Sequence, residues 1–233
     1  LIMDSNALRE KSRELGVTVT AFMTAVFMTA LIGIQNEICP ETLKQKEVKV
    51  LVPVDLRRVF GGNTLRNFAY FTVPSIDPRL GEYTFEEIAD IVSRQMQLDI
   101  TQKNMRAKIY PNVRDEQNPI LKIAPLFLKD IAMKTVFSLV GERKSTLSLS
   151  NLGLVDIPDA MKPYVDHFDF VLGHQSTAPY NAGMLSYGGV VRLNMIRNTK
   201  EPRLERALYE VLRSRGVKVK VESNFRPEPP EKR

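Results

Sequence analysis

The sequence feature that most restricts the fold is an apolar stretch over residues 21–34, which only two threonines and one glycine interrupt. The stretch is shorter and more polar than the roughly 20 apolar residues that a membrane-spanning helix needs. Thr18 or Thr20 can begin it as a helix, because a threonine hydroxyl accepts a hydrogen bond from a main-chain amide in the first turn. A helix that is apolar on nearly every face has to be covered on all sides, so we predict a buried core helix and no membrane span.

Other segments of the first half have weaker local signals. Thr84 and Glu87 have the spacing of a capping box, which predicts the start of an amphipathic helix that continues to about residue 107. β-branched runs predict a buried strand at residues 48–54 and a further strand at residues 68–73. Helices are also predicted at residues 5–15 and at about 119–139.

The clearest local signal in the second half is a β-hairpin, because Gly188 and Gly189 separate strand-like residues 183–187 from residues 190–196. The other elements predicted there are strands at residues 145–149, 167–172 and 217–221 and a helix at about 201–215. This order predicts an α/β fold, specifically an α+β two-layer sandwich in which a mixed sheet of about five or six strands carries helices mainly on one side. We expect one domain over residues 1–224 and a solvated, proline-containing tail over residues 225–233.

Composition narrows the possible functions. The net charge of +6 is concentrated toward the C-terminus and lacks the interleaved aromatic residues of a nucleic-acid platform, so we expect no nucleic-acid partner. The single cysteine, Cys39, cannot form an internal disulfide, which indicates a reducing compartment and a cytoplasmic protein. Only two histidines are present, so we expect no metal site built from cysteine and histidine.

No complete catalytic motif is visible in the sequence. There is no dinucleotide fingerprint, no phosphate-binding loop and no zinc-protease helix. Asp166 and Asp169 flank His167 as if to orient a base, although a histidine at a strand start among surface acids is the simpler explanation. His174 follows Gly173 at a predicted strand end, where substrate sites often lie, so His174 is a candidate for substrate contact.

Three segments together resemble a known superfamily. Val52-Pro-Val-Asp-Leu-Arg57 with Asn67-Phe-Ala-Tyr-Phe71, then Ser148-Leu-Ser-Asn-Leu-Gly153, and finally Pro179-Tyr-Asn-Ala-Gly183 with Ser186-Tyr-Gly188 occur in its order and spacing. The chain resembles the second lobe of the condensation-domain superfamily, which includes chloramphenicol-acetyltransferase-like enzymes, wax-ester synthases and peptide-synthetase condensation domains. The alcohol-acetyltransferase-like branch is the most similar. The resemblance covers about residues 8–224, and each motif alone is weak.

The resemblance implies one lobe of a two-lobe acyltransferase. In this superfamily two α/β lobes face each other across a tunnel, and the first lobe carries an H-H-x-x-x-D motif whose second histidine is the general base. The present sequence contains no such motif, so we expect a C-terminal lobe cut from a longer protein, whose partner is the missing N-terminal lobe. The intact protein would transfer an acyl group from acyl-CoA, such as acetyl-CoA, to a small-molecule alcohol without a bound cofactor. The isolated chain is expected to be inactive and to self-associate through the severed face.

The resemblance also implies which side chains face the tunnel. The matching segments contain the expected substrate contacts Asn67, Tyr180 and Asn181, and His174, which precedes the last of these segments, is expected to join them. Ser148, Ser150 and Asn151 are candidate hydrogen-bond donors to the oxyanion that forms during acyl transfer. A polar turn before Gly153 explains these three residues as well as a catalytic role does.

Arg57 follows an apolar strand, where a guanidinium needs a carboxylate partner. Asp55, on the same strand face, is one candidate partner. The resemblance implies another, the aspartate of the missing H-H-x-x-x-D motif, in which case Arg57 would join the two lobes.

Two other classes of protein remain compatible with the sequence. A non-catalytic binding or scaffold module could keep the lobe without the chemistry. A small acetyltransferase could instead work at a trimer interface with His174 as its base. The first is distinguished by whether H-H-x-x-x-D is encoded upstream of Leu1, and the second by whether the chain is a trimer in solution.

Overall fold

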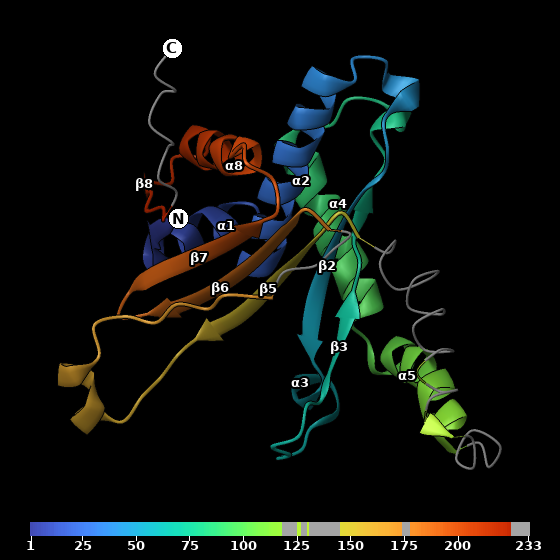
Figure 1. Cartoon of the computed structure of the whole chain (residues 1–233), viewed down its shortest axis with the longest axis vertical. Coiled ribbons are helices and arrows are strands. Elements are labelled where there is room, and N and C mark those ends of the chain that lie inside the picture. Colours follow the sequence, from blue (N-terminus) through green and yellow to red (C-terminus); the bar gives the residue numbers. More distant parts are fainter. Residues whose placement is uncertain (118–124, 127–129, 131–144, 174–177, 225–233) are drawn as a thin grey trace.

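The computed structural model describes residues 1–117, 125–126, 130, 145–173 and 178–224, so the predicted helix at 119–139 and the predicted tail at 225–233 lie outside the described residues. The described strands form one mixed sheet in the order β3-β2-β5-β6-β7-β1-β8, with β4 paired to β2 (Figure 1). The strands are β1 (Ile2–Asp4), β2 (Val48–Asp55), β3 (Ala69–Thr72), β4 (Ser75–Ile76), β5 (Leu147–Leu154), β6 (Tyr180–Tyr187), β7 (Val190–Arg197) and β8 (Val219–Lys220).

Helices cover one face of this sheet, which confirms the predicted α/β architecture (Figure 1). The α-helices are α1 (Ser5–Glu14), α2 (Val19–Ile38), α3 (Leu56–Phe60), α4 (Phe85–Asp99), α5 (Gln102–Gln117) and α8 (Arg203–Ser214), and the short 3-10 helices are η1 (Thr42–Lys44), η2 (Pro78–Leu80) and η4 (Asp159–Tyr164). Apolar side chains of α2, α4 and α8 meet those of β2, β5, β6 and β7 in one continuous core.

Helix α2 is the centre of that core, as its sequence predicts. Thr18 is its N-cap and accepts a hydrogen bond from the amide of Ala21. Phe22 and Phe27 are at most 1% exposed although they lie on different faces of the helix, because α4, α8 and β2 all pack against it. By length and composition alone, helix α2 is long and apolar enough to cross a membrane, but 56% of its apolar stretch is buried within the protein.

Two local sequence signals are confirmed in detail. The Thr84 hydroxyl accepts from the amide of Glu87, and the Glu87 carboxylate accepts from the amide of Thr84, which completes the capping box at the start of α4. Gly188 and Gly189 have φ values of 56° and 81°, the left-handed conformation that the tight β6–β7 hairpin requires.

The predicted helix at residues 84–107 is wrong in its length, because the structure divides it into α4 and α5. The break follows Asp99, whose carboxylate accepts hydrogen bonds from Thr72 on β3 and from Lys108 on α5. Thr101 then accepts from the amide of Asn104 and so caps the new helix. Polar side chains at residues 99–104 therefore compete with helix continuation, a signal that amphipathic periodicity does not register.

The predicted strand count is also wrong, since the described residues form a sheet of eight strands rather than five or six. Strands β1 and β4 have three and two residues, which is too short for an alternating pattern to reveal them, whereas the strand predicted at residues 217–221 is present as the two-residue β8. Strand β1 pairs antiparallel with both β7 and β8. Its last residue, Asp4, is also the N-cap of α1.

The predicted strand at residues 167–172 is wrong as well, because this segment has no regular secondary structure. Residues 165–173, called the covering segment below, cross the sheet face opposite the helices. Main-chain atoms of Phe170 lie so close to Gly183 on β6 that a Cβ added there would be 2.2 Å from the Phe170 carbonyl oxygen. Of the apolar residues that suggested a strand, Phe168 packs its ring edge to face on that of Tyr187, with 5.0 Å between the ring centroids, whereas Val171 is 61% exposed.

The sheet separates along its length between β2 and β5. These parallel strands pair only at Val50–Leu147 and Leu51–Ser148, and beyond that point β2 pairs with β3 while β5 continues beside β6. Figure 1 shows the two halves diverging toward α3 on one side and η4 on the other. The predicted strand at 145–149 therefore continues to Leu154, with a shift in register between Asn151 and Leu154.

Gly183→Ala should destabilise the chain by about 1–3 kcal/mol, because the new Cβ would overlap main-chain atoms of the covering segment. Gly33→Ala is the matched control, since its Cβ meets nothing within 4 Å and alanine favours the interior of α2. Urea unfolding of both variants measures the difference. An unchanged midpoint for Gly183→Ala would show that the covering segment does not pack on β6.

Candidate functional site

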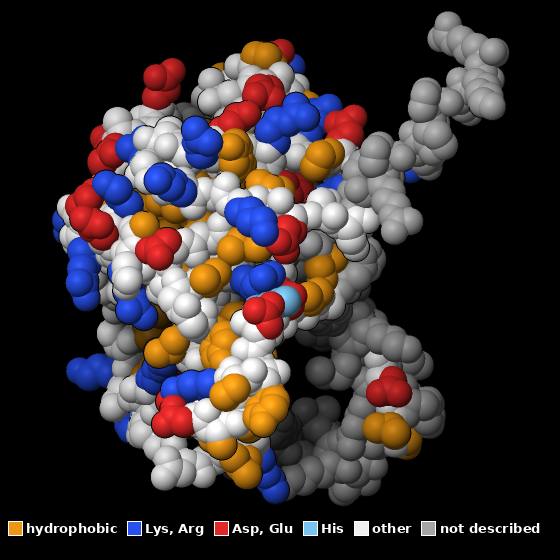
Figure 2. Space-filling view, turned by 90° about the vertical axis from the view of Figure 1, so that its left-hand side faces the viewer, with side chains coloured by type: hydrophobic (Ala, Val, Ile, Leu, Met, Phe, Trp, Pro, Cys, Tyr) orange, Lys and Arg blue, Asp and Glu red, His pale blue; other side chains and the backbone are white. Residues whose placement is uncertain are grey.

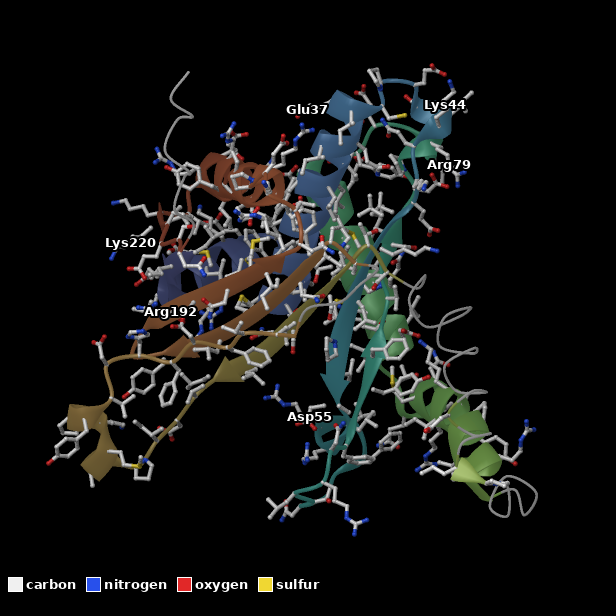
Figure 3. The ribbon with its side chains drawn as sticks, viewed as in Figure 1. Glu37, Lys44, Asp55, Arg79, Arg192 and Lys220 are labelled. Atoms are coloured by element: carbon white, nitrogen blue, oxygen red, sulfur yellow. The ribbon has the colours of Figure 1, made fainter. Side chains whose placement is uncertain are left out.

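The polar residues singled out in the sequence gather where β2 and β5 separate. Ligands of open parallel sheets bind beyond the carboxyl ends of the strands, at points where neighbouring strands diverge. Asp55 ends β2 and Arg57 lies in α3 immediately beyond it, while Ser148 and Ser150 lie on β5. Figure 3 shows Asp55 at the lower end of β2, well away from Arg192 and Lys220 at the other side of the sheet.

Arg57 lies in the first turn of α3 rather than on the strand, which corrects the expected geometry. Its guanidinium donates to Asp55 Oδ1 at 3.1 Å, to the Thr64 carbonyl at 2.9 Å and to the Arg66 carbonyl at 2.5 Å. The Arg57 and Asp55 side chains remain 34% and 42% exposed. The half-exposed Arg57 side chain thus holds the loop at residues 61–67 by hydrogen bonds to its carbonyls, and Asp55 is its carboxylate partner within the chain.

The Asp55 carboxylate also caps α3. The hydrogen bond from the Arg57 amide, then that from the Arg57 guanidinium, lower the pKa of Asp55 below its ordinary value. A carboxyl group with a lowered folded-state pKa stabilises the folded state above its unfolded pKa and loses that contribution as the pH falls through the folded value. The contribution of Asp55 to the stability of the folded state at the C-terminal end of β2 should therefore be lost in acid.

Ser148, Ser150 and Asn181 lie on the helix-free face of the sheet, where Ser148 pairs in register with Asn181 and Ser150 with Gly183. Ser148 is 9% exposed and Asn181 is 3% exposed. The Asn181 amide donates to the Gly173 carbonyl at 3.0 Å, and its buried Oδ1 atom has no hydrogen-bond partner among the residues that the structure describes. The covering segment therefore lies directly over this set of polar groups.

Two other candidate residues point to the opposite face. Asn151 donates to the Thr20 hydroxyl at the start of α2 and accepts from the amide of Gly153, so it supports the β5 bulge. Tyr180 packs against the helix-covered core, and Thr199 donates to its hydroxyl at 3.4 Å. Strand alternation separates Asn151 from Ser148 and Ser150, so the three candidate oxyanion donors do not lie on one face of the sheet.

The remaining predicted contacts are not brought together with these groups. Asn67 is exposed in the loop at residues 61–67, to which Arg57 donates hydrogen bonds. His174 lies outside the described residues. In the described part of the chain, no group of three or more histidine, cysteine, aspartate or glutamate side chains could hold a metal ion.

A second polar cluster, which the sequence showed only in part, surrounds His167. The imidazole Nδ1 is 2.7 Å from Asp166 Oδ2, and Nε2 is 3.5 Å from Asp169 Oδ2. Arg192 on β7 lies 3.7 Å from Asp169 and 3.6 Å from Glu222. Arg192 and Glu222 are far apart in sequence from His167, and alternation along β7 was the only available sign that Arg192 faces this side.

The comparisons with known proteins bear on the fold. No protein-family model and no curated protein matches the sequence of this chain. Among solved structures, it is similar to the condensation domain that mediates chain release from the enacyloxin polyketide synthase, with a TM-score of 0.55 and 13% identity over 98% of this chain and 42% of the other.

Two further structures share the arrangement. The wax ester synthase/diacylglycerol acyltransferase from Marinobacter aquaeolei has a TM-score of 0.50 and 15% identity over 93% of this chain and 48% of the other. Vinorine synthase has a TM-score of 0.50 and 11% identity over 91% of this chain and 46% of the other. The chain thus has the fold expected from the resemblance, that of condensation domains and related acyltransferases, and it spans less than half the length of each of these three proteins.

Arg57→Ala should raise the pKa of Asp55 only partway toward its ordinary value. The guanidinium hydrogen bond is lost, but the larger effect, the hydrogen bond from the residue 57 amide, remains. NMR titration of the Asp55 carboxyl carbon measures this shift, and Arg79→Ala, which acts on the separate Asp77 pair, is the control. A titration of Asp55 that Arg57→Ala does not move would contradict the observed pairing.

Proposed function

We propose that the chain is the C-terminal lobe of a CoA-dependent O-acyltransferase of the alcohol-acetyltransferase-like type. The observation that carries this proposal is the coverage of the similar structures, because the chain matches nearly end to end but accounts for less than half of each of three of them. A single lobe with an open end where β2 and β5 diverge is what one half of a two-lobe tunnel requires.

The proposed chemistry divides between two lobes. In the intact protein, the histidine base of the H-H-x-x-x-D motif on the N-terminal lobe takes the proton of the acceptor alcohol. The alcohol oxygen then attacks the carbonyl carbon of an acyl thioester such as acetyl-CoA, and the thiolate leaves. Ser148 and Ser150 supply donors to the transient oxyanion from the helix-free face of this lobe. No bound cofactor takes part, and we place the protein in the cytoplasm.

Exposed apolar side chains support a large partner at the open end. Leu65, in the loop beyond α3, is fully exposed, and Leu154 at the end of β5 is 65% exposed. Tyr164, at the end of η4, is 87% exposed. All three lie on the diverging ends of the sheet, and large exposed apolar groups gathered in one region are typical of an interface.

The isolated chain should not turn over acyl-CoA with alcohols, whereas the chain reassembled with the upstream half of its gene product should do so. Loss of a general base alone lowers rates by about 10²–10⁴. Thiol release from acetyl-CoA in the presence of simple alcohols measures this. Turnover by the isolated chain that His174→Ala abolishes would instead favour the trimeric enzyme. Absence of H-H-x-x-x-D from the upstream half would favour a binding module.

In the reassembled protein, Ser148→Ala should lower kcat by about 10²–10³ with little change in folding, as expected for one oxyanion donor. Ser186→Ala is the matched control, because Ser186 lies on β6 but donates to the Gly153 carbonyl at the other face. Steady-state kinetics of both variants provide the comparison. Equal kcat values for the two variants would remove Ser148 from the proposed mechanism.

A further inference from the structure

Basic side chains gather where α3 meets the start of α5, in a region called the basic corner below (residues 55–72 and 99–110). These two stretches contain six lysine and arginine residues and only two aspartates. Two of the cations are paired within the chain, Arg57 with Asp55 and Lys108 with Asp99. The other four are exposed and have no carboxylate partner in the part of the chain that the structure describes: Arg58, Arg66, Lys103 and Arg106.

The structure brings the two stretches of the basic corner into direct contact. Gln102, in the first turn of α5, donates to the Val59 carbonyl in α3 at 2.8 Å. One turn later, the guanidinium of Arg106 lies over the ring of Phe60, with 5.7 Å to the ring centroid. The unpaired cations therefore come from α3, the loop at residues 61–67 and α5, but they lie together at one end of the sheet.

The opposite end of the sheet has a different distribution of charge. Figure 2 shows the side that carries β7 and β8, where acidic and basic side chains are interspersed. Lys220 pairs there with Glu222 at 2.8 Å, and Arg192 lies 3.6 Å from the same carboxylate. The basic corner has no such compensation for four of its cations, although like charges in one region repel each other. A concentration of uncompensated positive charge attracts anionic ligands.

The basic corner is set apart from the proposed oxyanion donors by the length of half a strand. Ser148 on β5 pairs in register with Leu51 on β2, and Asp55, which ends β2, is four residues further along. At about 3.3 Å per residue this separation is roughly 13 Å. In an acyl-CoA the extended pantetheine arm separates the thioester from the phosphates. A phosphate site therefore has to lie at a distance from the reacting carbonyl, as the basic corner does.

We propose that the basic corner binds phosphate groups, and that in the proposed acyltransferase these are the phosphates of CoA. Lysine and arginine side chains bind phosphate by charge-assisted hydrogen bonds, and an arginine can direct two parallel N–H groups at one phosphate. Arg57 holds the loop at residues 61–67 through the carbonyls of Thr64 and Arg66, so little loop freedom is lost when a ligand binds. Only the assignment to CoA rests on the proposed function, because affinity for phosphate groups is measurable without turnover.

Isothermal titration calorimetry of the whole chain with CoA tests the site, at about 0.05 M salt to limit screening. Arg58→Ala combined with Lys103→Ala should raise the Kd for CoA by about 3- to 20-fold, as expected for two exposed charged contacts. Neither side chain makes a hydrogen bond or ion pair within the described residues, so folding should be unchanged. Arg206→Ala combined with Lys218→Ala is the matched control, because it removes two exposed, unpaired charges at the other end of the sheet.

Changing the ligand separates the phosphates from the rest of CoA. Dephospho-CoA, which lacks the 3′-phosphate, should bind more weakly than CoA, and S-acetylpantetheine should not distinguish the Arg58→Ala/Lys103→Ala variant from the wild type. Tripolyphosphate identifies the source of the phosphate groups. Tighter binding of CoA than of tripolyphosphate assigns the basic corner to the acyl donor, whereas equal binding supports a general phosphate site and removes the assignment to CoA.

The phosphate site is overturned if the Arg58→Ala/Lys103→Ala variant binds CoA and tripolyphosphate as the wild type does. It is also overturned if the control variant weakens binding equally, or if the chain binds neither ligand. None of these results decides the acyl-transfer proposal, because that proposal is judged by turnover of the reassembled protein.

Discussion

The rest of the structure depends on the burial of α2. A 20-residue helix with apolar side chains on every face needs a sheet on one side and helices on the others, which here are α4 and α8. Each large apolar side chain removed from water contributes about 1.5–3 kcal/mol, so the two fully buried phenylalanines Phe22 and Phe27 alone stabilise this arrangement considerably. Covering α2 fixes the helices to one face of the sheet and leaves the other face to polar groups.

That constraint explains which parts of the fold could be predicted from the sequence. Helix α2, the capping box of α4 and the β6–β7 hairpin follow from local patterns that the core reinforces. Strand β1 forms because β7 offers it an edge, and its three residues carry no pattern of their own. The apolar alternation around Phe170 was misleading, because a segment that lies on a sheet buries some of the same residues as a strand within it.

The sequence supplied the candidate site residues but not their geometry. Motif resemblance selected Ser148, Ser150, Asn151 and Asn181, yet the register of β5 with β6 decides which of them share a face. The hydrogen bond from Asn151 to Thr20 assigns Asn151 to supporting the start of α2. The charged neighbours of His167 come from β7 and β8 and are brought together only by tertiary structure, which no spacing rule anticipates.

The polar groups of the two faces differ in how completely they are satisfied, and this difference bears on function. On the helix side, Asn151 uses both ends of its amide within the chain. On the helix-free side, none of the described residues donates to the buried oxygen of Asn181, and a buried acceptor without a donor costs about 1–3 kcal/mol. The Asn181 amide nitrogen is held by the Gly173 carbonyl, so this oxygen is fixed on the sheet face where Asn181 pairs with Ser148. In the proposed function, a hydrogen-bond donor on the acyl-transfer substrate would complete the bonding of Asn181 beside the oxyanion donors.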